Sequence, residues 1–142
     1  GLPDGFKPAK INADTELLKT GDKLVLVGFG LTDGRLNTTA MVLNRTVTPI
    51  ADTHFSETEF TTDQRLGTGA CRGDSGGPAY FLTPDDELIL VGVTSRSHED
   101  PSGGCDKLGV FTSTAANSQW ILDTSILLQS EEVIGEKIPQ PF

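Results

Sequence analysis

Short runs of apolar and β-branched residues, each followed by turn-forming residues, recur along most of this chain. Groups rich in Gly, Pro and Asp separate the runs at Thr32–Gly34, Thr83–Asp86 and Asp100–Gly104. Runs of this kind, bounded by such residues, predict β-strands. The chain is therefore expected to be mainly β, with strands at Lys23–Phe29, Ala40–Val47, Pro78–Leu82, Leu88–Thr94 and Gly109–Thr112.

One segment near the end of the chain has helical spacing instead. The positions i, i+1, i+4, i+7 and i+8 of one face are Trp120, Ile121, Thr124, Leu127 and Leu128. This pattern predicts an amphipathic helix of about three turns that docks its apolar face on a barrel or sandwich. Residues 129–142 are charged and contain Pro, and they are expected to form an extended tail.

Length and charge limit the classes of function. The chain has 142 residues, 16 Gly, 8 Pro and 36% hydrophobic residues, which predicts one loop-rich globular domain with a core. The 20 acidic and 11 basic residues give a net charge of −9, which repels phosphate backbones and anionic lipid surfaces. No apolar run approaches the ~18 residues that span a bilayer, and no secretory leader opens the chain. We therefore expect no nucleic-acid or membrane partner, and any secretory signal to lie upstream or to have been removed.

The run GACRGDSGGPAY, residues 69–80, has the residue types of a catalytic loop. A serine hydroxyl becomes a useful nucleophile when a tight loop also aims N–H groups at the developing oxyanion, and glycines permit that close approach. Ser75 would be the nucleophile, and the amides of Gly73 and Ser75 would be the two donors. Asp74 would fix the loop's shape through a buried cationic partner. The plainer alternative is a serine in a glycine-rich turn.

The two cysteines, Cys71 and Cys105, enclose 33 residues that include part of this run. A disulfide of that span would stabilise the fold by roughly 3.5–4 kcal/mol and would imply an oxidising compartment. Two unrelated buried thiols are the alternative, and the spacing alone does not decide between them. Neither histidine lies at ligand spacing from a cysteine, so no metal site is expected.

The sequence GACRGDSGGP resembles the active-serine loop of the trypsin and chymotrypsin family of serine endopeptidases. Other segments match in order and approximate spacing. PAKI and GDKLVLVGFG resemble the entry into the family's second barrel, and LVGVTSRS resembles the strand that binds the substrate backbone. Cys105 with LGVF resembles the far wall of the specificity pocket, and SQWI the closing helix. The resemblance extends from Pro8 to Leu128 and is weak between Val47 and Leu66.

This resemblance implies a fold and a domain organisation. The fold would be the second six-stranded antiparallel Greek-key β-barrel of a chymotrypsin-like protein, with a C-terminal α-helix. Residues 1–20 would be the interdomain linker, 21–128 the barrel with its closing helix, and 129–142 the tail. A disulfide between Cys71 and Cys105 is also implied.

By resemblance, the base of the specificity pocket falls at Gly69, where no carboxylate is present to select Lys or Arg. Gly69 and Gly109 would leave volume for a medium to large uncharged side chain. The substrate-binding residues that the resemblance implies are Gly69, Ala70, Arg72, Ser95, Arg96, Ser97 and Gly109.

Two arginines depart from the usual pattern of the family. Arg72 would lie at the pocket mouth and Arg96 in the neighbouring subsite, where together they would favour acidic residues in the substrate. Alternatively, both side chains extend into water or pair with Glu99 and Asp100.

The general base for Ser75 is missing from this sequence. Its histidines, His54 and His98, do not fit the family's order of His, Asp and Ser, and both are interpreted as surface-loop residues. Asp14, in DTELL, mimics the family's buried Asp but lies too close to the first barrel strand and is interpreted as a loop or turn residue. Because the triad needs a His and an Asp, we expect a partner: the N-terminal β-barrel half of the same precursor.

The sequence thus predicts one half of a serine endopeptidase, which hydrolyses a peptide or protein through an acyl-enzyme on Ser75, without a cofactor, and is inactive alone. Asp74 would bind the freed N-terminal ammonium of a cleaved two-chain zymogen, and the Ser95 hydroxyl would meet the triad Asp. A secreted location, extracellular or periplasmic, is expected, and Asn37 and Asn44 begin Asn-x-Thr sequons. Two alternatives remain open: a catalytically inactive protease-like module that binds proteins, and an inert fragment.

Overall fold

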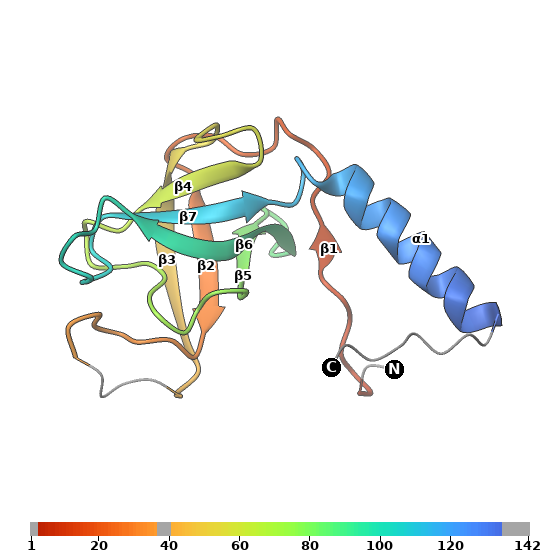
Figure 1. Cartoon of the computed structure of the whole chain (residues 1–142), viewed down its shortest axis with the longest axis horizontal. Coiled ribbons are helices and arrows are strands. Elements are labelled where there is room, and N and C mark those ends of the chain that lie inside the picture. Colours follow the sequence, from red (N-terminus) through yellow and green to blue (C-terminus); the bar gives the residue numbers. More distant parts are fainter. Residues whose placement is uncertain (1–2, 37–40, 135–142) are drawn as a thin grey trace.

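A closed antiparallel β-barrel of six strands forms the body of the structure, a computed structural model that describes residues 3–36 and 41–134 (Figure 1). The elements are β1 (Lys10–Ile11), β2 (Lys23–Gly28), β3 (Asn44–Asp52), β4 (Glu59–Asp63), β5 (Pro78–Leu82), β6 (Leu88–His98), β7 (Leu108–Ser113) and α1 (Ser118–Ile134). The barrel closes in the order β2, β3, β4, β7, β6, β5 and back to β2. β1 pairs in parallel with β6, outside the barrel. The predicted fold class, a six-stranded antiparallel barrel with a C-terminal helix, is confirmed.

The core lies inside the barrel and consists of side chains that alternate along the strands. The rings of Phe60 on β4 and Phe111 on β7 stack with their centroids 5.3 Å apart. Gly92 on β6 makes room for this pair, because a Cβ at that position would overlap the Phe60 ring. Burial of each of these two rings contributes about 1.5–3 kcal/mol to the stability of the fold. The buried core cluster is Leu24, Leu26, Ile50, Phe60, Ala70, Ala79, Val91 and Phe111.

Two strands differ from the sequence prediction. The strand predicted at Ala40–Val47 begins at Asn44 and continues to Asp52, and Met41, at φ 83°, has a left-handed backbone that an extended strand does not adopt. β4 was not predicted at all. It has a single large apolar residue, Phe60, and its other buried positions are threonines, so neither an apolar run nor an alternation marks it.

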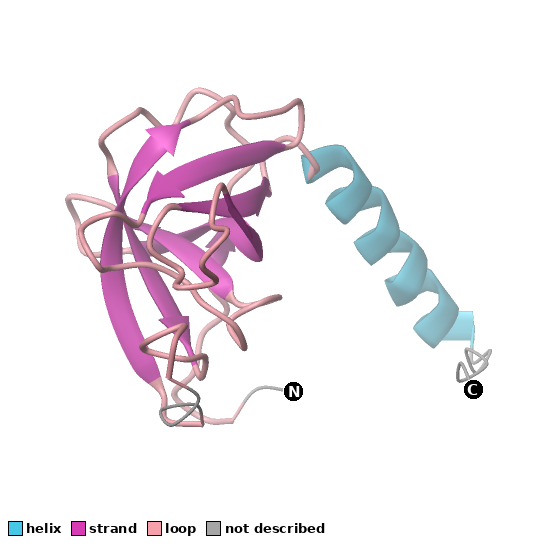
Figure 2. Ribbon diagram, turned by 60° about the vertical axis from the view of Figure 1, so that its left-hand side comes forward, coloured by secondary structure: helices cyan, strands magenta, loops and turns pink. Residues whose placement is uncertain are grey.

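Helix α1 extends away from the barrel instead of docking on it (Figures 1 and 2). Trp120 is 69% exposed, and Leu127 is 56% exposed, so the predicted docking of this face is wrong for this chain. The helix continues to Ile134, and the predicted extended tail is therefore wrong for residues 129–134, which contain no Gly or Pro to end the helix. Residues 135–142 lie outside the described part. In the described part no helix is both long and apolar enough to cross a membrane.

Three connections between strands meet at one end of the barrel and build the site. They are residues 29–36 and 41–43 between β2 and β3, 64–77 between β4 and β5, and 99–107 between β6 and β7. A disulfide and side-chain hydrogen bonds join them. The segment with the predicted nucleophile is the middle one of the three.

Candidate active site

Backbone hydrogen bonds fix the loop that contains Ser75, within the loop before the serine and to Thr94 on β6 after it. The amide of Asp74 donates to the Cys71 carbonyl at 3.0 Å, and that of Gly76 donates to the Thr94 carbonyl at 2.9 Å. The Thr94 amide in turn donates to Gly77 at 2.9 Å. Gly76 has φ 81°, in the left-handed region that favours glycine. Ser75 is exposed, and its Oγ lies 3.5 Å from the carbonyl oxygen of Ser95. The hydroxyl thus points to the surface from a fixed backbone.

The amides of Gly73 and Ser75 are the predicted oxyanion donors. Among the hydrogen bonds of residues 3–36 and 41–134, neither amide is a donor, so both are available to a ligand. Gly73 has φ 97°, and a Cβ there would come within 3.0 Å of the Gly30 Cα. Glycine is therefore required at position 73 both by its backbone conformation and by the close approach of the neighbouring chain.

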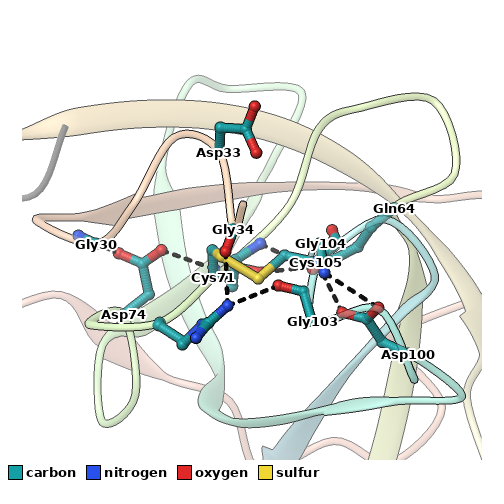
Figure 3. Close-up of a disulfide and its surroundings, with 12 residues drawn as sticks. Gly30, Asp33, Gly34, Gln64, Cys71, Asp74, Asp100, Gly103, Gly104 and Cys105 are labelled. Atoms are coloured by element: carbon teal, nitrogen blue, oxygen red, sulfur yellow. Dashed lines mark hydrogen bonds between the residues drawn. A yellow bond between two sulfur atoms is a disulfide. The ribbon is translucent and has the colours of Figure 1, made fainter. Parts of the chain in front are cut away.

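The carboxylate of Asp74 binds backbone amides on two segments of the chain. Oδ1 accepts from the Gly30 amide and Oδ2 from the Cys71 amide, both at 2.9 Å (Figure 3). A Cβ at Gly28 or at Gly30 would overlap this carboxylate, which explains the glycines of GFG. No cationic side chain of the described residues forms an ion pair with Asp74.

A pocket of about 410 Å³ opens beside Asp74. Its walls come from the end of β2, the connection that follows β2, the start of β3 and residues 67–71 and 104–106. The lining is polar and of mixed charge, with the carboxylates of Asp33, Asp74 and Asp106 and the guanidinium groups of Arg35 and Arg45. Arg35 pairs with Asp106 at 2.6 Å. Asp74 thus borders a space that a group of another chain could enter.

The predicted disulfide between Cys71 and Cys105 is present, with the two Cα atoms 5.4 Å apart. It ties the Ser75 loop to the connection between β6 and β7. Asp100 binds the same connection: its carboxylate accepts from the Cys105 amide at 2.7 Å and from the Gly104 amide at 3.2 Å (Figure 3). Burial acts to raise the pKa of Asp100, but these hydrogen bonds outweigh it and lower the pKa below its ordinary value.

Arg72 is exposed, and its guanidinium also helps to hold these connections together. Its Nη2 donates to the carbonyl of Gly34 at 2.6 Å and to that of Gly103 at 2.9 Å. Neither predicted partner, Glu99 or Asp100, forms an ion pair with it. The guanidinium therefore joins two connections instead of pairing with a carboxylate.

Arg96 is paired with Glu59, a residue of β4 that sequence reasoning did not assign. Nη1 donates to Oε1, and Nη2 donates to Oε2 at 3.1 Å. The hydrogen bond from Arg96 is the main reason why the pKa of Glu59 is lowered. Because its charge is already matched within the chain, Arg96 gives little support to the predicted preference for acidic substrate residues.

A second pocket, of about 240 Å³, contains Ser75. Of the predicted substrate-binding residues, five line it and two, Gly69 and Gly109, do not. Gly69 lines the 410 Å³ pocket instead. The residues around the Ser75 pocket are Ala70, Cys71, Arg72, Ser75, Thr94, Ser95, Arg96 and Ser97.

Gln64 explains why the two glycines are absent from this pocket. Its side chain is buried, with 1% exposed, and a Cβ at Gly69 or at Gly109 would overlap it. In the pocket that contains Ser75, Gln64 therefore fills the space next to these glycines that was expected to admit a substrate side chain. Nε2 donates to the carbonyls of Ala70 and Cys105, both at 3.0 Å, and Oε1 accepts from the Ala70 amide at 2.8 Å. No sequence signal marked Gln64, which follows the strand that was not predicted.

The histidines lie away from the Ser75 pocket. His54 is exposed in a loop after β3, where its amide donates to Asp52 at 2.8 Å. His98 is at the end of β6 and not in a loop as predicted, with its ring edge-on to Phe55 at 5.0 Å. Asp14 is exposed in a turn, as predicted, and accepts from the Glu16 amide at 2.9 Å. Within the described residues, neither histidine lines the pocket of the nucleophile.

Comparison with known proteins places this geometry among proteases. A family model described as Trypsin matches residues 2–121. A kallikrein 1-related peptidase b3 from Mus musculus is 33% identical over 133 residues, which cover 87% of this chain and 48% of the mouse protein. The fibrinolytic enzyme isozyme C of Lumbricus rubellus is 32% identical over 134 residues, and chymotrypsin-2 of Vespa crabro 27% over 122. These matches cover 83% and 81% of this chain, and 52% of each relative. The chain thus spans about half the length of these three relatives.

Proposed function

This chain belongs to the trypsin family of serine proteases, and we propose that it is the C-terminal half of such an enzyme, with Ser75 as nucleophile. The observation that carries the proposal is the exposed Ser75 hydroxyl beside two amides, of Gly73 and Ser75, that donate to no other described residue. Ser75 Oγ attacks the peptide carbonyl, its proton passes to a general base, and the two amides bind the oxyanion. The base then protonates the leaving amine, and water hydrolyses the acyl-enzyme on Ser75.

The general base belongs to an N-terminal barrel half, which also supplies the triad Asp. Two observations support this division: the chain spans about half the length of its relatives, and neither histidine of the described part lines the Ser75 pocket. The Ser95 hydroxyl, now 3.4 Å from Arg96 Nη1, would meet the triad Asp in the complete enzyme. Without that half, Ser75 has no base, and the isolated chain is expected to be inactive.

The 410 Å³ pocket beside Asp74 is the proposed site for an N-terminal ammonium freed when a zymogen is cleaved into two chains. Asp74 lines the pocket, and the excess of three carboxylates over two guanidinium groups in its lining favours a cation. An ammonium there would replace the amides of Gly30 and Cys71 as partners of Asp74 and would fix the conformation of the loop.

A secreted location is supported by the Cys71–Cys105 disulfide, which persists in oxidising compartments. The sequon at Asn44 lies on an exposed residue at the start of β3. The sequon at Asn37 falls outside the described residues.

The test is labelling with a fluorophosphonate, which reacts with activated serine nucleophiles. In the two-barrel protein, meaning this chain together with its N-terminal half, we expect stoichiometric labelling that is lost in Ser75→Ala. Native mass spectrometry of the same preparation reports whether the second chain is bound. Absence of labelling in a preparation that contains both halves would favour the inactive binding module over the protease.

The inactive module, in turn, would bind its partner through a surface altered at Arg72 and Arg96. Both guanidinium groups are engaged within the chain, Arg72 by two carbonyls and Arg96 by Glu59. The charge of Arg96 is matched by Glu59, so only Arg72 is left as a cationic anchor for a protein partner. The inactive module also gives no role to the exposed Ser75 hydroxyl, so the protease is the function that the geometry supports best.

A further inference from the structure

The side chain of Gln64 lies behind one wall of the pocket that contains Ser75. Ala70 lines that pocket, and Gln64 binds both the amide and the carbonyl of Ala70. On its two other sides it meets Gly69 and Gly109, where even a Cβ would overlap it. In Figure 3 the Gln64 carboxamide lies next to Cys105, to whose carbonyl it donates. The glutamine therefore occupies the space next to Gly69 and Gly109, through which the pocket would otherwise deepen on that side. Ala70, Cys71 and Thr94 also line the 410 Å³ pocket.

The carboxamide is fixed in this position by its hydrogen bonds. Both hydrogens of Nε2 are used, by the carbonyls of Ala70 and Cys105, and Oε1 accepts from the Ala70 amide. If the side chain swung out to admit a ligand, it would leave these buried backbone groups without partners. We therefore expect Gln64 to stay in place when substrate binds.

What remains of the pocket is small and has no carboxylate in its wall. Its volume of about 240 Å³ is below the roughly 300–1,000 Å³ of typical ligand pockets. Of the two arginines in its wall, Arg96 is paired with Glu59, and Arg72 binds two backbone carbonyls and keeps its positive charge. Its other walls are a methyl group, a disulfide and hydroxyls, from Ala70, Cys71, Thr94, Ser95 and Ser97.

We infer that Gln64 sets the depth of this pocket on the side of Gly69 and Gly109 and restricts the residue on the acyl side of the scissile bond to a small one, such as Ala, Ser or Val. This inference rests on the proposed function and replaces the medium to large side chain expected from the sequence. Gln64 would act by the volume that it fills and not by contact with the reacting atoms, so it is a specificity-determining residue.

The experiment compares peptides that differ only at that residue, Ala, Val, Leu or Phe, with the two-barrel protein as enzyme. The wild type should cleave the Ala and Val peptides best. Gln64→Ala should raise the ratio of kcat/KM for Phe over Ala by about 10-fold or more, since each methylene accommodated in an apolar pocket is worth roughly 10–200-fold. Gln64→Met, which keeps the volume but loses the hydrogen bonds, is the matched control and should lower all rates while leaving the ratio unchanged.

A Phe-to-Ala ratio that does not change in Gln64→Ala, or that changes equally in Gln64→Met, would overturn the inference. Binding of indole to the same preparations, followed by NMR of the Ala70 and Ser95 amides, gives a readout that needs no catalysis. Saturable shifts are expected in Gln64→Ala and not in the wild type or Gln64→Met. Indole binding to the wild type, or no indole binding to Gln64→Ala, would contradict the inference. If instead the wild type neither labels nor hydrolyses any peptide, the proposed function fails while the indole result still decides about the pocket.

Discussion

The Ser75 loop is held by contacts from several separate parts of the chain, whereas α1 makes its hydrogen bonds within itself and exposes its apolar side chains. Gly30, Gln64 and Cys105 all bind the loop, through a carboxylate, a carboxamide and a disulfide. On α1, by contrast, Trp120 is 69% exposed and Ile126 is 56% exposed.

The two regions place different demands on structure. A nucleophile and its oxyanion donors act only if their positions are fixed before the substrate arrives, so the fold constrains the loop from every side. A helix makes its own backbone hydrogen bonds and needs another surface only to bury its apolar side chains. The described part of this chain does not cover the apolar side chains of α1. We therefore expect substitutions of the residues that hold the Ser75 loop to lower the free energy of unfolding strongly, and substitutions on α1 to change it very little.

The largest effect is expected from removing the disulfide. Cys71→Ser combined with Cys105→Ser should lower the free energy of unfolding by about 2–4 kcal/mol, because the bridge closes a long loop of the unfolded chain. Denaturant unfolding of the 142-residue chain measures this loss, and reducing the wild type should reproduce it. A loss below about 0.5 kcal/mol would mean that the hydrogen bonds of Asp74 and Gln64 hold the loop without the disulfide.

A smaller effect is expected from filling the space in front of Asp74. Gly28→Ala should destabilise the chain by about 1–3 kcal/mol, because the new methyl overlaps the carboxylate. In the double variant with Asp74→Ala the overlap is gone, so the two losses should not add. A double-mutant cycle measures this coupling, expected at about 0.5–3 kcal/mol, and additive losses would contradict the packing described here.

The dependence of the unfolding free energy on acid pH should reflect the ion pair between Asp63 and Arg65, which flank Gln64 in the sequence. Hydrogen bonds from Arg65 lower the pKa of Asp63 from 3.8 to about 2. Since the folded pKa is depressed, the stabilisation is present above about pH 4 and is lost as the pH falls toward 2. Asp63→Asn should therefore flatten the unfolding free energy over that interval. The effect should be modest and weaker in high salt, since the Arg65 side chain is 66% exposed. A variant curve parallel to that of the wild type would contradict the assignment.

The smallest effect is expected on α1. Trp120→Ala and Leu127→Ala should each change the free energy of unfolding of the 142-residue chain by less than about 0.5 kcal/mol, since both side chains are largely exposed. Leu24→Ala, at a fully buried position, is the matched control and should cost about 2–5 kcal/mol. Repeating the Trp120 variant in the two-barrel protein sharpens the comparison, because a larger loss there would place α1 in the interface between the halves.

The part of the site that could be predicted was the part encoded by neighbouring residues. Gly73, Ser75 and Gly76 determine the loop by their own conformational preferences and chemistry, and resemblance to a family supplied the Cys71–Cys105 pairing. β4 could not be predicted, because Thr61 and Thr62 are buried without being apolar. A threonine in the sequence does not reveal which face of a barrel it will occupy.

By itself, the sequence determined the mainly β class, the loop that presents Ser75 and the position of the helix. Only the tertiary structure decided what each of these meets: Gln64 binds Cys105 across 41 positions, Arg96 pairs with Glu59 across 37, and α1 leaves the barrel uncovered. The physical reason is the distance along the chain over which each kind of interaction acts. Backbone preferences act over a few residues, whereas the filling of a pocket and the neutralisation of a charge depend on which distant strands the barrel brings together.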